Sequence, residues 1–420
     1  MFDVHPTRFA SACGKGAWFL LLMLALTVPA LAGGGSKKKS TAPAADTTAQ
    51  APKVIDYSNI VWPNPPAIAR IKYEAFFAAQ QISQVEPATK TKKQNWMDRL
   101  AGTQTEQEHP HVLFQLDQPY GMAVDSKGQL YVADTKVGAI FIFNTETRMV
   151  ELIKNGVHAH FGRIIGLAMD DNDRLFIADP GLKHVLVLNS KHEREDVITQ
   201  GVVEPSMLAL DKDNRLLYVS DTSLDQVLVY DADTLKLKRT IGTSGHNHEL
   251  TDPGNFAKPT GLAVDKDGNL YVADTMNNRI EEFDADGQFI RAWGKNGDGP
   301  GYFARPKGVA IDSDGNIWVA DGMQDRVQVF NQDLQYCISF GGHGFMPGQF
   351  AALVNIISDN QRNRIFTTEI YYGRAQEFRY VTNAEAEQLQ KERDATHQKK
   401  AEDRKAVPAP APAADAKPQG

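Results

Sequence analysis

Residues 259–283 read PTGLAVDKDGNLYVADTMNNRIEEF, and residues 306–330 read PKGVAIDSDGNIWVADGMQDRVQVF. The two stretches match position by position at an offset of 47 residues. The same frame recurs at 119–134, 164–179 and 205–221, and more faintly at 353–369. Six copies of one unit therefore follow each other, and units of this length are typical of repeat architectures.

Each copy contains the pattern of four short strands. Gly261–Val264 is apolar on both faces, as expected for an innermost strand that has neighbours on each side. A turn with Asp, Gly and Asn follows, and these residues favour tight hairpins. Leu270–Ala273, Arg279–Phe283 and Phe289–Trp293 supply three more strands between polar turns. Four strands per unit of about 40 to 50 residues indicate the blade of an all-β propeller.

The repeats resemble a known family. The pattern P-x-G-[ILV]-A-V-D, then G-N-[ILV]-[YW]-V-A-D, then N-R-[IV], is that of NHL repeats, and residues 259–283 and 306–330 match it best. The resemblance extends over about 119–381. It implies a six-bladed β-propeller, and in this family the face formed by the loops typically binds proteins or, in some eukaryotic members, RNA.

Closure of the propeller is predicted from an incomplete sixth copy. That copy supplies strands at Val354–Ser358, Arg364–Thr368 and Ala375–Tyr380, and then continues into a helical segment without a fourth strand. An isolated apolar strand, Ala69–Phe77, precedes the first copy. Since pairing the two would cover both unpaired edges, we expect this strand to complete the sixth blade. Residues 62–66 are expected to form an extended strap along the rim.

The flanking segments have distinct compositions. Arg8 and Lys15 precede an apolar run and an Ala30-Leu31-Ala32 site, which predicts a signal peptide and a periplasmic or secreted protein. A retained anchor is the alternative; lipidation is not predicted, because Gly34 is not a cysteine. The predicted parts are a signal peptide at 1–32, a flexible leader at 33–54, a strap, closing strand and short helix (Lys90–Leu100) at 55–118, propeller repeats at 119–381, a charged helix capped by Asn383 at 382–405, and a Pro/Ala-rich tail at 406–420.

The net charge argues against nucleic acid as a partner, and the cysteine content argues against stabilisation by disulfide bonds. A formal net charge of −7 argues against a nucleic-acid partner, which requires a basic field. No membrane span is expected after removal of the signal. Two cysteines cannot form a disulfide framework, and Cys13 lies in the signal segment, so Cys337 is predicted to be a buried small apolar residue.

Acidic residues recur at two positions in every copy. One set follows the first strand, and the other follows the second strand. We interpret both as turn hydrogen-bonders rather than as a ring of metal ligands. Arg279, Arg326 and Arg374 come five residues after three acids of the second set, so we expect three ion pairs across the second hairpin. The two sets are Asp125, Asp170, Asp211, Asp265, Asp312 and Asp359, and Asp134, Asp179, Asp221, Asp274, Asp321 and Glu369.

Histidines gather between the fourth strand of one copy and the first strand of the next. These connections and the loops between second and third strands emerge on one side of a propeller, which we call the loop face. Imidazole suits zinc, copper or iron, so converging pairs would form a transition-metal site. No cofactor is predicted otherwise. The metal candidates are His158, His160, His246, His248 and His343, and a further pair is His109 and His111.

The repeats also resemble the propellers of two enzyme families. Peptidyl-amidating lyases place zinc-binding histidines directly after the blade proline, and gluconolactonase-like propellers hold a metal on Glu, Asn and Asp of the inner strands. Here the inner strands are apolar apart from their terminal acids, and neither site is carried over. The residues after the proline, or its equivalent, are Tyr120, Ile165, Ser206, Thr260 and Lys307.

The remaining candidate is the loop face itself, with Met, Tyr and amide groups that are common at protein-recognition surfaces. The sequence therefore favours a binding or scaffold module for a protein, peptide or glycan over an enzyme. The alternative is a metal-dependent hydrolase or lyase that uses the loop histidines. The predicted binding residues are Lys136, Lys183, His184, Met276, Asn277, Met323, Gln324, Tyr371 and Tyr372.

Overall fold

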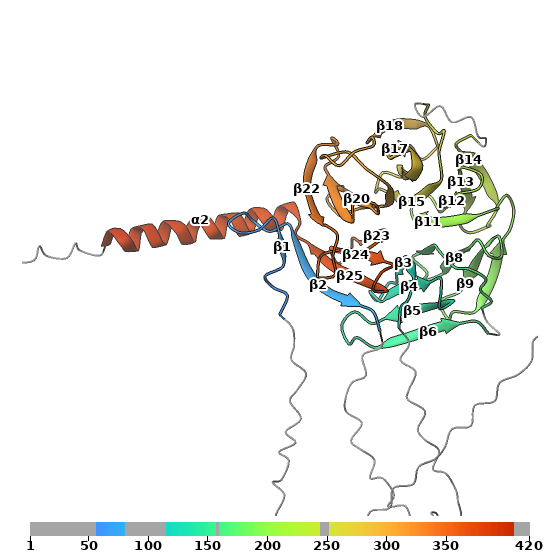
Figure 1. Cartoon of the computed structure of the whole chain (residues 1–420), viewed down its shortest axis with the longest axis horizontal. Helices are drawn as coiled ribbons and strands as arrows, with labels where there is room; N and C mark the ends of the chain where they lie inside the picture. The colour runs from blue at the N-terminus through green and yellow to red at the C-terminus, as the bar shows by residue number, and fades with distance from the viewer. Residues whose placement is uncertain (1–55, 80–114, 157–158, 244–251, 407–420) are drawn as a thin grey trace, which may run out of the picture. The chain divides into compact units, whose positions relative to one another are not determined.

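The computed structural model describes residues 56–79, 115–156, 159–243 and 252–406. Six antiparallel sheets surround a central axis, and they succeed one another around it in chain order (Figure 1). The predicted six-bladed β-propeller is confirmed. The signal peptide, the leader, the helix at Lys90–Leu100 and the Pro/Ala-rich tail lie outside the described residues. No described helix is both long enough and apolar enough to cross a membrane.

Each of the first five blades is a four-stranded meander. The first blade contains β3 (Pro119–Val124), β4 (Leu130–Asp134), β5 (Ala139–Phe143) and β6 (Val150–Lys154). The second contains β7 (Leu167–Met169), β8 (Leu175–Asp179), β9 (His184–Leu188) and β10 (Arg194–Ile198). The third contains β11 (Pro205–Asp211), β12 (Leu216–Asp221), β13 (Gln226–Asp231) and β14 (Leu237–Ile241).

The fourth and fifth blades are built from the best-matched copies, and the sixth closes the circle. The fourth contains β15 (Pro259–Val264), β16 (Leu270–Asp274), the 3-10 turn η1 (Thr275–Asn277), β17 (Arg279–Phe283) and β18 (Phe289–Trp293). The fifth contains β19 (Pro306–Ile311), β20 (Ile317–Asp321), β21 (Arg326–Phe330) and β22 (Tyr336–Gly341). The sixth contains β23 (Leu353–Asp359), β24 (Arg364–Glu369), β25 (Arg374–Tyr380), β2 (Ile71–Phe77) and β1 (Val61–Trp62).

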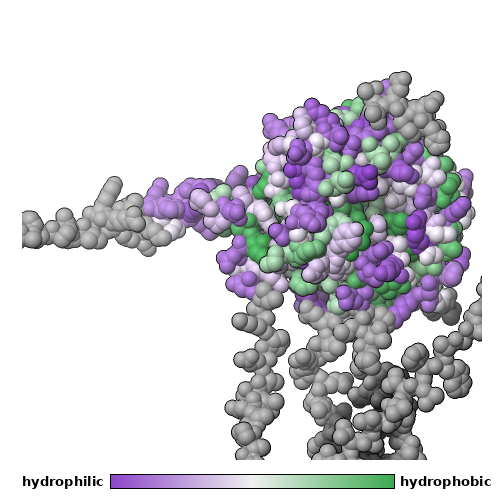
Figure 2. All heavy atoms as spheres, viewed as in Figure 1, coloured by the Kyte–Doolittle hydropathy of each residue, from purple (hydrophilic) through white to green (hydrophobic). Residues whose placement is uncertain are grey.

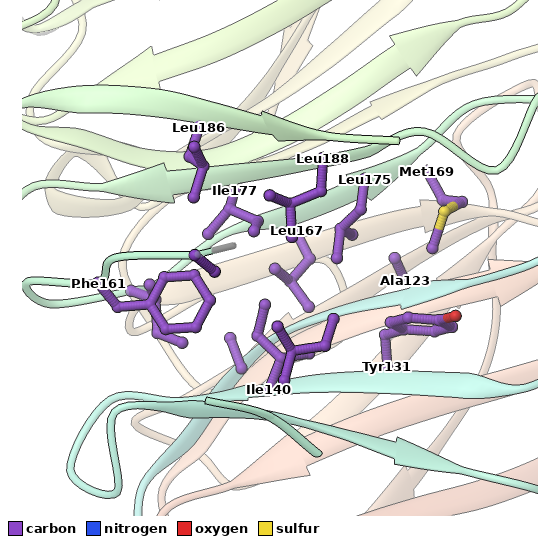
Figure 3. Close-up of a cluster of buried hydrophobic side chains, with 14 of the residues drawn as sticks. Ala123, Tyr131, Ile140, Phe161, Leu167, Met169, Leu175, Ile177, Leu186 and Leu188 are labelled. Atoms are coloured by element: carbon purple, nitrogen blue, oxygen red, sulfur yellow. The ribbon is translucent and has the colours of Figure 1, made fainter. Parts of the chain in front are cut away.

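Burial follows the distance of a strand from the hub. The second strands β4, β8, β12, β16 and β20 are buried along their whole length, whereas the outer strand β18 is mostly exposed. Apolar side chains from adjacent blades fill the space between them. Figure 3 shows this for the first two blades, where Ile140, Phe161 and Leu167 lie in one buried cluster. The repeat therefore builds its core between blades, as neighbouring copies cover each other.

The inner strands approach closely around the hub. Gly121 donates its backbone N–H to Ile165 O over 2.7 Å, and a Cβ atom on Gly121 would lie only 2.2 Å from that oxygen. A Cβ atom on Gly166 would lie 2.1 Å from Ser206 O. Glycine is required at these two positions because the next blade occupies the space of a side chain.

The N-terminal closing strand pairs with the sixth blade as predicted. β2 lies antiparallel to β25, from Ile71 opposite Tyr380 to Phe77 opposite Ala375. The predicted strap is partly different, because Val61–Trp62 forms the short strand β1, which adds to β2 as a fifth strand. The Trp62 ring packs against Phe340 and Phe378, with centroid distances of 5.2 and 6.0 Å. The segment before the first copy thus joins the fifth and sixth blades.

The charged helix is present as α2 (Asn383–Ala406). Its cap differs from the prediction, since Thr382 Oγ1 accepts the backbone N–H of Glu385 at 3.3 Å. The side chain of Asn383 instead accepts a hydrogen bond from Arg70 Nη2 at 2.5 Å. Figure 2 shows the coloured part of α2 as mostly hydrophilic, in agreement with a helix that has little to bury.

The prediction for Cys337 is wrong. This residue is exposed on the outer strand β22, because the fourth strand of a blade has no further strand to cover it. The aligned Ile290 on β18 is likewise exposed.

We predict that shortening a buried side chain of the closing strand β2 destabilises the whole propeller. Phe77 is 3% exposed, and its ring lies 5.4 Å from that of Phe143 in the first blade. Phe77→Ala is expected to lower the free energy of unfolding by about 3–5 kcal/mol, the usual cost of deleting a buried ring. Chemical denaturation measures this. Phe76→Ala, at a site that is 41% exposed, is the control, and equal losses for both variants would contradict the closing role.

The buried carboxyl group of Glu281 is expected to make the stability of the chain depend on pH. The side chain is buried, accepts Gly254 N at 2.9 Å and pairs with Arg279 Nη2 at 2.6 Å. Burial raises its pKa to about 7 from an ordinary value of 4.5. The equivalent residues in the next two blades, Gln328 and Gln376, are neutral amides that accept the matching backbone N–H.

Because the folded chain keeps this proton at higher pH than the unfolded chain, its contribution is present below about pH 4.5 and is lost as pH rises through about 7. Glu281→Gln removes that loss. The stability difference between the Gln variant and the natural chain is expected to grow by roughly 3 kcal/mol between pH 4.5 and 8, as measured by denaturant titration. A pH-independent difference would contradict the prediction.

Candidate binding site at the hub mouth

A buried acid at the end of each second strand holds the loops of the loop face. In all six blades this carboxylate accepts a backbone N–H from the connection that enters the blade. Asp179, for example, accepts Gly162 N and Arg163 N at 2.6 and 2.8 Å, and also Leu182 N in the following turn at 3.0 Å. The acids are Asp134, Asp179, Asp221, Asp274, Asp321 and Glu369.

The other set of acids closes turns at the opposite face. Asp265 Oδ1, for example, accepts Asp267 N and Asn269 N, each at 2.9 Å. The interpretation of these acids as turn hydrogen-bonders is therefore confirmed. The predicted arginine pairs form at Asp274–Arg279 (2.8 Å) and at Glu369–Arg374. The third predicted pair, between Arg326 and Asp321, is wrong, because Arg326 donates to the backbone carbonyls of Asp298 and Gly299.

Of the five metal candidates, only His160 and His343 are described. The exposed His343 has its Nδ1 2.8 Å from Oδ2 of the buried Asp325. His158, His246 and His248 lie outside the described residues. Within those residues no group of three or more His, Cys, Asp or Glu side chains is placed to hold a metal ion. The metal-dependent alternative stays a prediction.

The loop-face candidates divide into free and engaged side chains. Met323 and Tyr371 are 67% and 64% exposed, and Met276, Tyr372 and Lys183 are also exposed. The other four candidates are engaged or partly buried. Lys136 pairs with Asp117 at 2.8 Å; Asn277 donates to Asn255 O at 3.0 Å; Gln324 donates to Gly297 O; and His184 is half-buried, which lowers its pKa and favours neutral imidazole.

Exposed apolar side chains concentrate on this face beyond the predicted set. Phe345 and Met346 are exposed in the connection to the sixth blade, and the Phe345 ring lies 4.9 Å from that of Tyr372. Sequence reasoning missed both, although they occupy the same kind of connection as the histidines. Among the described residues, ten of the fifteen exposed large hydrophobic side chains belong to loops of this face: Val137, Leu182, Val203, Met276, Tyr302, Met323, Phe345, Met346, Tyr371 and Tyr372.

A cavity of about 290 Å³ opens where the hub channel meets the loop face; we call it the hub-mouth pocket. Its walls come from all six blades, and Met323 is the only predicted binding residue among them. Five of the others, Tyr120, Ile165, Ser206, Thr260 and Lys307, hold the position after the blade proline or its equivalent, where amidating lyases place their zinc-binding histidines. The lining residues are Tyr120, Ile165, Ser206, Met207, Thr260, Arg305, Lys307, Gly322, Met323, Ala352, Leu353, Val354 and Ile370.

The lining of the pocket is mostly apolar and includes two cationic side chains. Arg305 and Lys307 are the charged side chains of its lining, which contains no acid. Burial lowers the pKa of Lys307, and the nearby positive charges of Arg305 and Lys258 act in the same direction. Burial also raises the pKa of Tyr120, so its phenol stays a neutral donor. The arrangement suits an anionic ligand group with apolar surroundings.

The opposite end of the channel differs in chemistry. A cavity of about 510 Å³ there is lined by the terminal parts of the inner strands, including Asp125, Asp170, Asp211, Asp265 and Asp359. Their oxygens accept turn N–H groups or arginine donors. These acids therefore serve the fold. Figure 2 shows hydrophilic residues over most of the visible face, with hydrophobic ones toward its middle.

Comparisons with known proteins agree with this architecture. Residues 116–143 match the model of the NHL repeat, residues 258–402 match a model described as a 6-bladed beta-propeller, and residues 178–295 match the SMP-30/Gluconolactonase/LRE-like region. The chain thus belongs among the β-propellers. It is a six-bladed propeller that carries NHL repeats.

Curated relatives match over short regions. The chain is 38% identical over 87 residues to a probable peptidyl-alpha-hydroxyglycine alpha-amidating lyase of Caenorhabditis elegans, and 31% identical over 90 residues to NHL repeat-containing protein 2 of Homo sapiens. Each match covers 20% of this chain, and 24% and 12% of the respective relative. The chain therefore spans less than a quarter of the length of either relative.

One solved structure is similar at the level of the fold. A structural genomics protein of unknown function from Bacteroides thetaiotaomicron gives a TM-score of 0.51 at 17% identity, covering 63% of this chain and 70% of that chain.

We predict that the buried acids keep the loop face rigid. Asp179→Ala leaves three backbone N–H groups without their acceptor and is expected to cost about 2–4 kcal/mol of stability. Hydrogen exchange should accelerate at residues 162–163 and 182 before it does so in β8. Asp213→Ala, at an exposed turn of the opposite face, serves as the control. Unchanged exchange in the Asp179 variant would contradict this role.

Proposed function

We propose that this chain is an exported binding or scaffold propeller whose loop face holds a protein or peptide ligand. The observation that carries the proposal is the gathering of exposed Met, Tyr and Phe side chains around the hub-mouth pocket. Large amphipathic or flexible apolar side chains of this kind supply much of the energy at protein interfaces. A glycan ligand is the less favoured case, because the surroundings of the pocket are rich in Met and aliphatic residues.

The mechanism is rigid display. Each connection that carries exposed residues is tied to its blade by a buried carboxylate, as Ala351 N is to Glu369 at 2.7 Å beside the sixth blade. Phe345 and Met346 are held in turn by their own carbonyls, which accept hydrogen bonds from Arg374 at 3.1 and 3.4 Å. A surface that is ordered before binding loses less entropy when a ligand is bound.

Selection from a displayed random-peptide library tests the proposal. Peptides selected on the natural chain are expected to bind the double variant Met323→Asp, Tyr371→Asp at least about tenfold more weakly, since both side chains are exposed on the loop face. The matched control, Phe289→Asp with Ile290→Asp, changes two exposed residues of the outer strand β18. Peptides that bind the loop-face variant as well as the natural chain would contradict the proposal.

A further inference from the structure

The fifth blade differs from the others at two positions that touch each other in the hub-mouth pocket. Lys307 follows its proline, and Gly322 stands where other blades have Thr135, Pro180, Thr222, Thr275 or Ile370. A Cβ atom on Gly322 would lie 2.9 Å from Lys307 Cγ and 2.6 Å from Leu353 O. The missing side chain at residue 322 therefore leaves the space that the stem of Lys307 occupies.

The charge of Lys307 has no acidic partner among the described residues. Three acids of the loop face pair with other side chains: Glu204 with Arg163 at 3.3 Å, Asp325 with His343 at 2.8 Å, and Asp117 with Lys136 at 2.8 Å. Arg305 and Lys258 add positive charge. A half-buried ammonium group without an acidic partner is stabilised when an external anion pairs with it.

The hydrogen-bonding groups around Lys307 indicate which anion fits. Backbone amides at the mouth are already used, since Gly322 N donates to Arg305 O, Met323 N to Asp321, and Leu353 N to Asp325. A cradle of free amides, which favours phosphate, is thus lacking in the described part of the mouth. Side-chain donors remain, because neither Ser206 Oγ nor Tyr120 Oη has a hydrogen-bond partner among the described residues.

We infer that the hub-mouth pocket binds a carboxylate of the ligand through Lys307, with Ser206 and Tyr120 as further donors. The inference rests on the proposed function and names the chemical group that the loop face selects. About 290 Å³ accommodates one side chain or chain terminus with an apolar portion against Met207 and Leu353. The carboxylate belongs either to an acidic side chain or to a C-terminus.

The test uses the full chain and a matched pair of probes, N-acetyl-phenylalanine and its uncharged amide. Calorimetric titration is expected to show that the acid binds about tenfold or more tightly than the amide, the effect of one charge-assisted hydrogen bond. Binding of the acid should weaken as pH rises from 7 to 10, because the pKa of Lys307 is lowered. Equal binding of acid and amide would overturn the inference, as would inorganic phosphate competing equally well.

Three variants locate the site. Lys307→Met removes the charge and should abolish the preference for the acid, whereas Lys307→Arg should keep it. Gly322→Ala intrudes on the lysine stem and should weaken acid binding while the charge is retained. The control is Lys212→Met, an exposed lysine at the opposite end of the channel. An acid preference that persists in a folded Lys307→Met variant would overturn the inference.

Library peptides distinguish the two sources of carboxylate, and they separate failure of the carboxylate inference from failure of the proposed function. Amidation of the peptide C-terminus, and Glu→Gln or Asp→Asn replacement within the peptide, show which carboxylate Lys307 contacts. Peptide binding could require Met323 and Tyr371 and yet be unaffected by amidation or by Glu→Gln and Asp→Asn replacement. In that case the carboxylate inference fails and the proposed function stands. If the small acid depends on Lys307 while no peptide depends on the loop face, the proposed function fails alone.

Discussion

The hydrogen bonds from backbone amides to one buried carboxylate per blade are the interaction on which the rest of the structure depends. The acid ends the second strand, and its oxygens reach the connection that arrives from the preceding blade. A buried carboxylate without these donors would carry a large desolvation cost. Strand, turn and connection are thus held in one arrangement, and every side chain of the loop face takes its position from that arrangement.

Closure adds a second constraint. A propeller remains open until its last blade meets its first, and here β2 completes the sixth blade by pairing with β25 from the other end of the repeats. Arg70, just before β2, donates to Tyr380 Oη at 3.2 Å, and Tyr380 Oη donates to Asp314 in the fifth blade at 2.7 Å. The hub-mouth pocket requires this closure, because all six blades supply its walls.

The repeats impose regularity, so departures from them mark individual function. In the fourth blade the two positions carry Thr260 and Thr275, whose hydroxyl groups hydrogen-bond to each other at 2.6 Å. The fifth blade replaces this pair with Lys307 and Gly322, and a lysine charge then enters the pocket. The acids of the opposite mouth follow the pattern and serve turns. The difference between the two ends of the channel therefore lies in a few positions.

The sequence by itself determined the blades, their number, the closing strand and the turn role of the acids, because these follow from apolar periodicity and turn chemistry repeated along the chain. It also placed Met323 and Tyr371 on the loop face. Tertiary structure alone decided that Tyr120, Ser206 and Lys307 share a pocket, that Gln324 is engaged in holding a loop, and that Cys337 is exposed. The physical reason is that convergence at a hub depends on how blades curve and close, and residues about fifty positions apart become neighbours only then.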